Sequence, residues 1–365
     1  MSESLSVADT RRSRILFASR PVEQLEPEGG LQLQRDLADA IAREGGLSPS
    51  VFSTDSSFWS EGINAVPVYT DDGWDFRRRL EFIAGVWRNH LRFDVLHTAH
   101  VPAPLNSKVL TVLAQRHRAA GKASVQTITG LPNGGRIRAT HLWGDIVVCQ
   151  ATTTLDRAVD AGARATLITP WPSRYRVVHN EARRQATRAD KFARWDEIVV
   201  FPGEFRRLGV DHCLGQMIDR IVKRRPATLV VLACRFDTEG IGRRLEDQNP
   251  GNVRSLGLVG GGMIELLEAA DLVIFPARKM AGKFQPPLVL LESLALGTPV
   301  YATEAVELPQ DHRLQIHRAP STLPWIEHGD LIADILARGN LRAPASWGFP
   351  ETFHQYVKLF DKLGG

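Results

Sequence analysis

The chain has 365 residues, which is more than one ordinary domain and fits two domains of about 150 residues each. Its composition, 43% hydrophobic and 24% charged, is typical of a globular protein and excludes disordered, collagen-like and coiled-coil classes. The formal net charge is +4, with 37 Arg against 8 Lys. No alternation of basic and aromatic residues marks a nucleic-acid surface, so we expect no nucleic-acid partner.

Membrane, disulfide and metal classes are also disfavoured. No window reaches the roughly 18 uninterrupted apolar residues of a membrane span, and residues 1–14 are polar, so we expect a cytoplasmic protein without integral membrane contact. Cys149, Cys213 and Cys234 lie far apart in the sequence and form no CxxC pair. The cysteines therefore predict neither a disulfide framework nor a zinc site.

Strand and helix patterns alternate through the first half of the chain. An apolar run at residues 14–19 is followed by a loop at residues 28–30 and a helical pattern. Further strand-like runs occupy residues 50–52, 94–97, 123–127, 145–148 and 166–168, and helical stretches occupy residues 76–91 and 107–120. This alternation predicts a parallel sheet with covering helices.

A polar, arginine-rich run at residues 174–194 separates the first half from a second alternation. We expect this run to be a solvated helix or linker, with contact to an anionic surface as the alternative. Strands are then predicted at residues 197–201, 228–233, 253–258, 271–275 and 299–302, and helices at 213–224, 263–269, 288–296 and 353–363. The pattern indicates two α/β halves.

Common catalytic motifs are missing from the sequence. The first predicted strand is not followed by GxGxxG, and no Walker loop, HExxH, GxSxG or kinase signature occurs. The sequence therefore disfavours a dinucleotide-dependent dehydrogenase and the chemistries of those motifs.

The most informative pattern lies in residues 270–276 and 287–300. A buried strand ends at Pro276, a loop crosses the carboxyl edge of the predicted sheet, and a helix follows whose N-terminal N–H groups could meet an anion. Glu292 lies among leucines in that helix, where an isolated carboxylate needs a partner. Ribose hydroxyls are one possible partner.

These residues resemble the retaining glycosyltransferases of family 4, and the resemblance extends over most of the chain. It implies an α/β protein of GT-B fold, with two Rossmann-like doubly wound domains facing a central cleft. We expect an acceptor-binding domain at residues 1–175, a domain for the nucleotide-sugar donor at 176–350, and a helix at 351–365 that packs back towards the first domain.

The resemblance also implies roles for individual residues. Glu292 would accept hydrogen bonds from ribose hydroxyls, and His100, or His97 in a shifted register, would face the transferring sugar. The backbone at Gly29 and Gly30 would approach the donor phosphate. The resemblance also implies that the reaction needs neither a metal ion nor a separate cofactor. The remaining residues expected around the donor are Arg206, Arg207, Lys279, Lys283, Gly203, Leu258, Val259 and Gln285.

Two positions depart from the family pattern. Phe284 stands where the family has its first acidic residue, eight positions before Glu292, and Gln285 beside it could hydrogen-bond sugar hydroxyls. Leu208 stands where a lysine usually precedes Gly209, and Arg206 and Arg207 are possible substitutes.

The expected function is transfer of a sugar from a nucleoside diphosphate donor to an acceptor, with retention at the anomeric carbon. A small-molecule acceptor is preferred over a lipid or a polysaccharide. A nucleotide-sugar 2-epimerase of the same fold and a non-catalytic nucleotide- or sugar-binding protein are the alternatives. In a membrane-peripheral variant of the main function, the region from Arg174 to Arg194 would bind vesicles in a salt-sensitive way.

Overall fold

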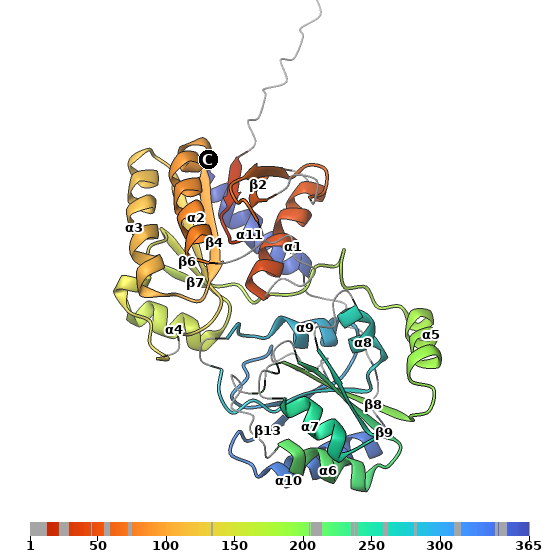
Figure 1. The fold of residues 1–365 in the computed structure, drawn as a ribbon. Coiled ribbons are helices and arrows are strands. Elements are labelled where there is room, and N and C mark those ends of the chain that lie inside the picture. The colour runs from red at the N-terminus through yellow and green to blue at the C-terminus, as the bar shows by residue number, and fades with distance from the viewer. Residues whose placement is uncertain are drawn as a thin grey trace, which may run out of the picture.

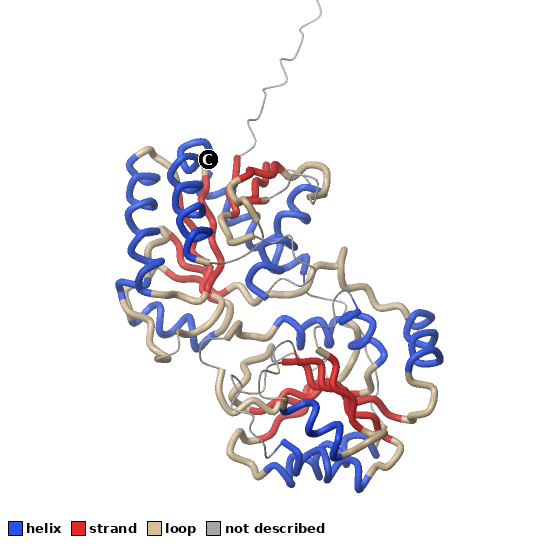
Figure 2. Tube along the Cα trace, viewed as in Figure 1, coloured by secondary structure: helices blue, strands red, loops and turns tan. Residues whose placement is uncertain are grey.

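The computed structural model describes residues 13–21, 29–44, 46–54, 59–71, 75–132, 134–203, 205, 214–234, 237, 240–257, 262–280, 283–309, 315–339, 342 and 349–364. Two parallel sheets, each covered by helices on both faces, make up this part of the protein (Figures 1 and 2). Among the described residues, no helix is both long enough and apolar enough to cross a membrane.

The N-terminal half contains a seven-stranded sheet in the order β3-β2-β1-β4-β5-β6-β7. Its strands are β1 (Arg14–Phe17), β2 (Ser48–Ser53), β3 (Asn64–Pro67), β4 (Val95–His100), β5 (Ala123–Ile128), β6 (Ile146–Cys149) and β7 (Ala165–Leu167). Its helices are α1 (Gly29–Glu44), α2 (Phe76–Asn89), α3 (Pro104–Ala119) and α4 (Thr152–Asp160), with short 3-10 turns η2 (His90–Arg92) and η3 (Ala139–His141).

Alternation along β1 divides the N-terminal core into two layers. Ile15 and Phe17 point to the side of α1, whereas Leu16 and Ala18 join the cluster under α2 and α3. Successive residues of a strand face opposite sides of its sheet, so a strand covered by helices on both faces is apolar throughout. The run that predicted this strand is continuous for that reason.

The C-terminal half contains a six-stranded sheet in the order β10-β9-β8-β11-β12-β13. Its strands are β8 (Glu197–Gly203), β9 (Thr228–Cys234), β10 (Val253–Leu256), β11 (Leu272–Phe275), β12 (Val300–Thr303) and β13 (Ile316–Ala319). The helices from residue 181 on are α5 (Glu181–Lys191), α6 (Leu214–Arg224), α7 (Ile241–Gln248), α8 (Met263–Ala269), α9 (Leu288–Ala295), α10 (Trp325–Ala337) and α11 (Phe349–Gly364).

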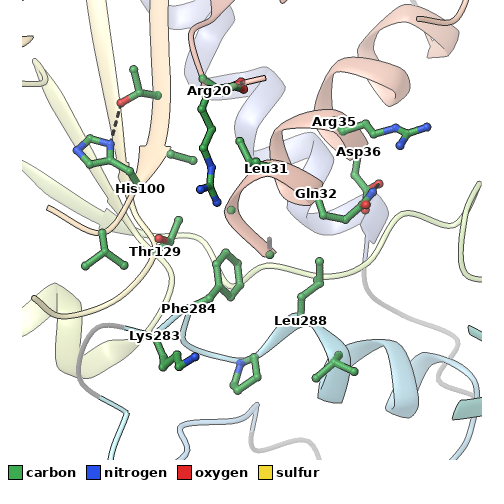
Figure 3. Close-up of a pocket in the computed structure, with 18 of the residues that line it drawn as sticks. Arg20, Leu31, Gln32, Arg35, Asp36, His100, Thr129, Lys283, Phe284 and Leu288 are labelled. Carbon is green, nitrogen blue, oxygen red and sulfur yellow. Dashed lines mark hydrogen bonds between the residues drawn. The ribbon is translucent and has the colours of Figure 1, made fainter. Parts of the chain in front are cut away.

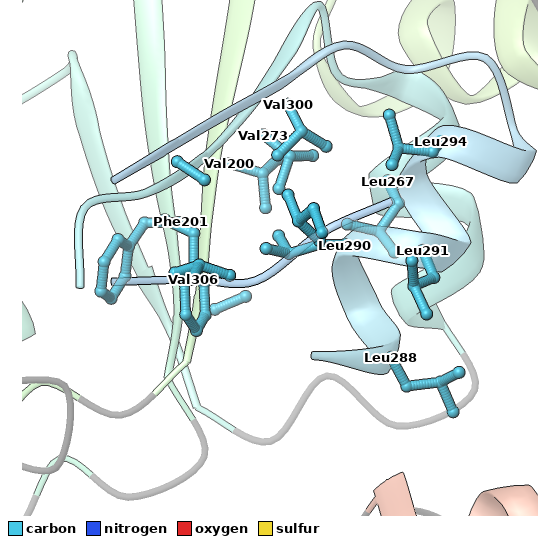
Figure 4. Close-up of a cluster of buried hydrophobic side chains, with 14 of the residues drawn as sticks. Val200, Phe201, Leu267, Val273, Leu288, Leu290, Leu291, Leu294, Val300 and Val306 are labelled. Carbon is cyan, nitrogen blue, oxygen red and sulfur yellow. The ribbon is translucent and has the colours of Figure 1, made fainter. Parts of the chain in front are cut away.

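The leucines of α9 pack directly on this second sheet. Leu290 lies beside Val200, Val273 and Val300, which come from three neighbouring strands, and Leu294 lies beside Leu267 of α8 (Figure 4). This packing fixes α9 on a face of the sheet, and Leu288 and Glu292, in its first turns, line the cavity described below.

Both halves have the strand order of a doubly wound Rossmann-like sheet, which confirms the predicted fold class. The second sheet repeats the order of the first six strands of the first sheet, and all recorded strand pairs are parallel. β3, β13, α4, α7 and α10 were not among the predicted ranges. Most residues of β3 and β13 are exposed or only partly buried, so neither strand has the continuous apolar run of an inner strand.

Helix α11 crosses from the end of the chain to the N-terminal half (Figure 1). The Tyr356 hydroxyl lies 3.1 Å from Thr127 Oγ1, and Thr352 Oγ1 donates to the carbonyl of Thr169 at 2.9 Å. The Phe360 ring packs edge-on against Phe17. Helix α11 therefore completes the face of the first sheet that α1 covers in part.

The arginine-rich run contains the helix α5, most of whose residues are exposed as predicted, but several of its arginines are paired with carboxylates. Arg183 Nε donates to Glu268 at 2.5 Å, and Arg188 Nη1 lies 2.8 Å from Asp271 Oδ2. Arg184 also pairs with Asp271, at 3.3 Å. These acidic residues belong to the α8–β11 region, so the charges of α5 fasten that helix to the second sheet.

Candidate functional site

A cavity of about 1220 Å³ lies at the carboxyl ends of both sheets (Figure 3). On the N-terminal side it is lined by residues after β1, by the first turns of α1 and by the end of β4. On the C-terminal side it is lined by Gly203, by the start of α8 and by residues from Lys283 to Glu292. Ligands of parallel α/β sheets bind at such strand ends, so this cavity is the candidate site.

The N-terminus of α1 opens into this cavity. Gly29 and Gly30 are its first two residues, and both line the cavity. The Phe284 ring from the other half lies so close that a Cβ on Gly29 would be 3.1 Å from its Cγ (Figure 3). A side chain at this position would therefore crowd the Phe284 ring, and the helix N-terminus offers N–H groups to an anion.

The loop that carries Phe284 is attached to the N-terminal half by backbone contact. The N–H of Gln285 donates to the carbonyl of Thr129 at 2.8 Å. A Cβ on Gly130 would lie only 1.8 Å from the carbonyl oxygen of Lys283. Gln285 itself is buried at this junction and does not line the cavity.

Glu292 is held in an ion-pair cluster that joins the two halves. Arg176 Nη1 donates to Glu292 Oε1 at 2.6 Å, and Arg176 Nη2 donates to Asp36 Oδ2, on α1, at 3.1 Å. Burial alone would lower the pKa of Arg176, but the two carboxylates outweigh it and raise that pKa. All three side chains line the cavity.

His100 reaches the cavity, whereas His97 does not. His97 is fully buried, with Nε2 2.9 Å from Thr127 Oγ1 and its ring against Phe17 and Phe360. The prediction of His97 as an alternative catalytic residue is therefore corrected: two or three residues further along β4 are needed to reach the carboxyl edge. His97 belongs to the core.

The imidazole of His100 is neutral at pH 7. Burial lowers its pKa to about 4. Its Nδ1 lies 3.2 Å from Thr98 Oγ1, and Nε2 has no protein partner within the described part of the chain. Nε2 is buried at the cavity wall, so a hydrogen bond from it to a bound hydroxyl requires the ring to turn towards the cavity.

Basic side chains surround the cavity. Arg20 follows β1 and points into the cavity between His100 and Leu31, and Lys283 lies below Phe284 (Figure 3). Lys279 is exposed and outside the lining. The other basic lining residues are Arg35, Arg43, Arg79, Arg176 and Arg183. The lining contains four carboxylates, Asp36, Asp39, Glu265 and Glu292, which are fewer than its basic side chains. The walls of the cavity therefore suit an anionic ligand.

Four predicted donor-site residues lie outside the described part of the chain: Arg206, Arg207, Leu258 and Val259. Cys213 is outside it as well, and Cys149 and Cys234 are buried free thiols. In the described segments, no group of three or more His, Cys, Asp or Glu residues is arranged to hold a metal ion.

The sequence interpretation missed Arg20 and Arg176. Arg20 follows the first strand within three residues, and the carboxyl ends of parallel strands are where ligands bind, so its position was a usable signal. Arg176 was included in the basic run, and no local pattern distinguished it from its neighbours. Its pairing with Asp36 and Glu292 spans 140 and 116 residues of sequence, respectively.

Residues 196–321 match the family model described as Glycosyl transferases group 1. No curated protein sequence matches the chain. Solved structures similar to it include Anabaena Alr3699/HepE in complex with UDP and glucose, at 14% identity over 96% of this chain and 100% of that chain, with a TM-score of 0.70. The catalytic domain of Starch Synthase IV from Arabidopsis thaliana, bound to ADP and acarbose, is 12% identical over 97% and 99% of the two chains, with a TM-score of 0.69.

WaaG, a glycosyltransferase involved in lipopolysaccharide biosynthesis, is 19% identical over 96% of this chain and 100% of that chain, with a TM-score of 0.59. At these identities the likeness shows a shared fold, and that fold is GT-B. The family match lies wholly in the half that contains β8 to β13.

Proposed function

We propose that this chain, whose residues 196–321 match the glycosyl transferases group 1 model, is a glycosyltransferase whose cavity binds a nucleoside diphosphate sugar and transfers the sugar to an acceptor. The observation that carries the proposal is the position of Glu292. It lies on α9 at the carboxyl edge of the second sheet, across the cavity from the N-terminus of α1.

The two walls of the cavity suit the two ends of such a donor. Glu292 is an acceptor for ribose hydroxyls, and its ion pair with Arg176 orients the carboxylate. The N-terminus of α1 at Gly29 and Gly30, together with Arg20 and Lys283, provides N–H groups and positive charge for a diphosphate. Arg206, Arg207, Leu258 and Val259 are proposed to complete the donor site.

The same charges support departure of the diphosphate. As the glycosidic bond to the donor breaks, negative charge develops on the leaving phosphate oxygen, and fixed cations and a helix N-terminus stabilise it. We therefore propose a metal-independent reaction with the nucleotide sugar as co-substrate and no further cofactor.

His100 is proposed to face the transferring sugar. Its neutral imidazole can accept or donate a hydrogen bond to a sugar hydroxyl without placing a second positive charge beside an oxocarbenium-like centre. We propose that the acceptor attacks the face that the diphosphate leaves, so that the anomeric configuration is retained.

The test is thermal unfolding of the purified chain with UDP, GDP, ADP, TDP and CMP, in parallel with Glu292→Gln. One diphosphate at about 100 times its dissociation constant should stabilise the protein by roughly 2.7 kcal/mol. Glu292→Gln should abolish most of that shift, and Glu327→Gln, an exposed control on α10, should retain it. Absence of any shift at millimolar concentration would contradict the donor site.

Product analysis then separates the alternatives. With the stabilising nucleotide identified, release of that diphosphate only when an acceptor is supplied supports transfer. Conversion of the nucleotide sugar without acceptor would indicate a 2-epimerase. Binding without any conversion, across an acceptor screen that includes lipids, would indicate a non-catalytic binding protein.

A further inference from the structure

One face of α2 is apolar and exposed, and its first half borders the cavity. Within the described part of the chain, Phe76, Leu80, Trp87 and Leu91 expose 74%, 50%, 47% and 49% of their surfaces, respectively. Their spacing, together with half-buried Ile83, places all of them on one side of α2 and its continuation η2. The opposite side carries the residues that pack on the sheet.

Positive charge borders this apolar stripe. Residues 75–92 contain five arginines and two carboxylates, Asp75 and Glu81. Both carboxylates are engaged within the helix region: Asp75 caps α2 by accepting from the N–H of Arg78, and Glu81 lies 3.4 Å from Arg77 and from Arg78. Arg79, Arg88 and Arg92 are exposed.

The neighbouring helix α3 extends the same surface. Figure 1 shows α2 and α3 side by side, and the Arg116 guanidinium lies 3.9 Å from the centroid of the Trp87 ring. Val112 and Lys108 on α3 are exposed as well. The α2–α3 surface therefore combines an apolar stripe, an exposed tryptophan and flanking cations, which is the composition of a helix lying in a membrane interface.

The stripe begins at the candidate site. Phe76, Arg79, Leu80 and Ile83 line the cavity, whereas Trp87 and Leu91 lie beyond it towards the other end of the helix. A partner that contacts this stripe would therefore lie next to the mouth of the cavity on the N-terminal half, where we propose that the acceptor binds.

The geometry points to an anionic lipid bilayer as the partner of the α2–α3 surface. The inference rests on the proposed function in one respect: a bilayer there would present a lipid-borne acceptor, rather than a small molecule, to the cavity. The basic run at residues 174–194, expected to carry such contact, is much less suitable because Arg176, Arg183, Arg184 and Arg188 are paired with carboxylates.

The test is co-sedimentation of the full chain with vesicles of phosphatidylcholine alone and of phosphatidylcholine with phosphatidylglycerol. We expect binding to the anionic vesicles that weakens as salt is raised, and little binding to neutral ones. The variant Leu80→Glu/Leu91→Glu should reduce anionic-vesicle binding at least tenfold. The control Ile326→Glu/Leu331→Glu, with 49% and 38% exposed side chains on α10, should bind as the unmodified chain does.

A second measurement covers the case in which the double variant does not fold. Phospholipids brominated on their acyl chains quench the fluorescence of a tryptophan that enters the bilayer. With anionic vesicles that contain such lipids, part of the tryptophan fluorescence of the unmodified chain should be quenched. Trp87→Phe, a conservative change, should remove most of that quenching. Unchanged quenching in Trp87→Phe, or no binding to anionic vesicles at low salt, would overturn the proposal.

Two further outcomes distinguish bilayer binding from the proposed nucleotide site and from self-association of the chain. Vesicle binding needs no nucleotide, and the nucleotide shift is measured without vesicles, so each proposal can fail while the other stands. Light scattering that shows a dimer of the unmodified chain, dispersed by Leu80→Glu/Leu91→Glu, together with no vesicle binding, would assign the surface to a second copy of the chain and overturn the bilayer.

Discussion

The two halves share a strand order but differ in what fills their interiors. In the C-terminal sheet the central strands are aliphatic, with Val199, Val230 and Val273 fully buried. In the N-terminal sheet, β4 and β5 bury His97, Gln126 and Thr127. The winding of a parallel sheet is set by the alternation of strands and crossover helices, so it tolerates this difference.

Polar groups inside the N-terminal half need partners that are distant in sequence. His97 Nε2 lies 2.9 Å from Thr127 Oγ1, which in turn lies 3.1 Å from the Tyr356 hydroxyl on α11. A buried polar group without a partner costs free energy, and α11 brings one of these partners from the far end of the chain. The first half therefore depends on the last helix, whereas the second sheet has a largely aliphatic core.

The largest predicted effect concerns the charge cluster that joins the halves. In Arg176→Ala, the buried carboxylates of Asp36 and Glu292 lose their cation, which should lower the free energy of unfolding by about 3–5 kcal/mol. Urea unfolding measures the change. Arg174→Ala, which removes a pairing with the less buried Glu44, is the control and should cost under about 1 kcal/mol. Equal effects of the two variants would contradict the cluster's role.

The dependence of the first half on α11 is tested by Phe360→Ala. The ring is fully buried against Phe17, His97 and Tyr356, so its removal should cost about 3–5 kcal/mol. In Phe360→Ala, amide hydrogen exchange should accelerate, relative to the unmodified chain, more in the N-terminal sheet than in the C-terminal sheet. Lys358→Ala, at an exposed position of the same helix, is the matched control. Uniform acceleration in both sheets would show that the halves unfold together.

Acid should weaken the N-terminal half more than the C-terminal half. Burial lowers the pKa of His97 to about 3 and of His100 and His117 to about 4, whereas the C-terminal half has His328, at about 4. Between pH 6.5 and pH 4 the unfolded chain binds more protons at these sites, so stability falls as the pH decreases. At pH 5 each such histidine should cost about 2 kcal/mol relative to pH 7.

Urea unfolding at pH 7 and pH 5 measures this loss. His117→Gln should reduce it by about 2 kcal/mol, since both ring nitrogens of His117 are buried without a partner in the described structure. His354→Gln, at an exposed position, should leave the loss unchanged. If His117→Gln lost as much stability between pH 7 and pH 5 as the unmodified chain, the lowered pKa of His117 would be contradicted.

The smallest expected effect lies at a second contact between the halves. Glu307 accepts hydrogen bonds from the N–H groups of Thr152 and Thr153 at the start of α4, and from Thr153 Oγ1 at 2.6 Å. Burial raises the pKa of Glu307, but these hydrogen bonds outweigh it and hold the pKa below the usual value. Glu307→Gln should therefore cost under about 1 kcal/mol at pH 7.

That difference should shrink as the pH falls below 4.5. The contribution of a carboxylate with a lowered pKa is fully present above its ordinary pKa and is lost as the pH falls through the lowered one. Thermal unfolding of both forms at pH 7 and pH 3.5 measures it. Glu304→Gln, three residues earlier, is the control. A pH-independent difference would indicate that shape, rather than charge, matters at Glu307.

The fold was predictable to a large extent because inner strands of parallel sheets are continuous apolar runs. Residues 197–201, 228–233 and 271–275 were predicted as strands and lie within or across β8, β9 and β11. Edge strand β3 was missed because its side chains are exposed or half-buried. Partial burial leaves little hydrophobic pattern to detect.

The candidate site was predictable mainly where a residue ends a strand or lies in the first turns of a helix. Gly29 and Gly30 begin α1, His100 and Gly203 end β4 and β8, and Glu292 lies in the first turns of α9; all five line the cavity. His97 was a wrong alternative because the spacing along a strand, rather than the residue type, decides which histidine reaches the sheet edge.

Sequence by itself determined the class of this protein: two parallel α/β halves, a final helix of amphipathic pattern, and a carboxylate on an otherwise apolar helix. Those features are local, since they follow from periodicity and from the residues next to each other in the chain. Tertiary structure alone decided that Arg176 joins Asp36 to Glu292, that Phe284 rests on Gly29, and that one face of α2 stays exposed. Each of those depends on how segments distant in sequence pack together, and local sequence patterns do not record such packing.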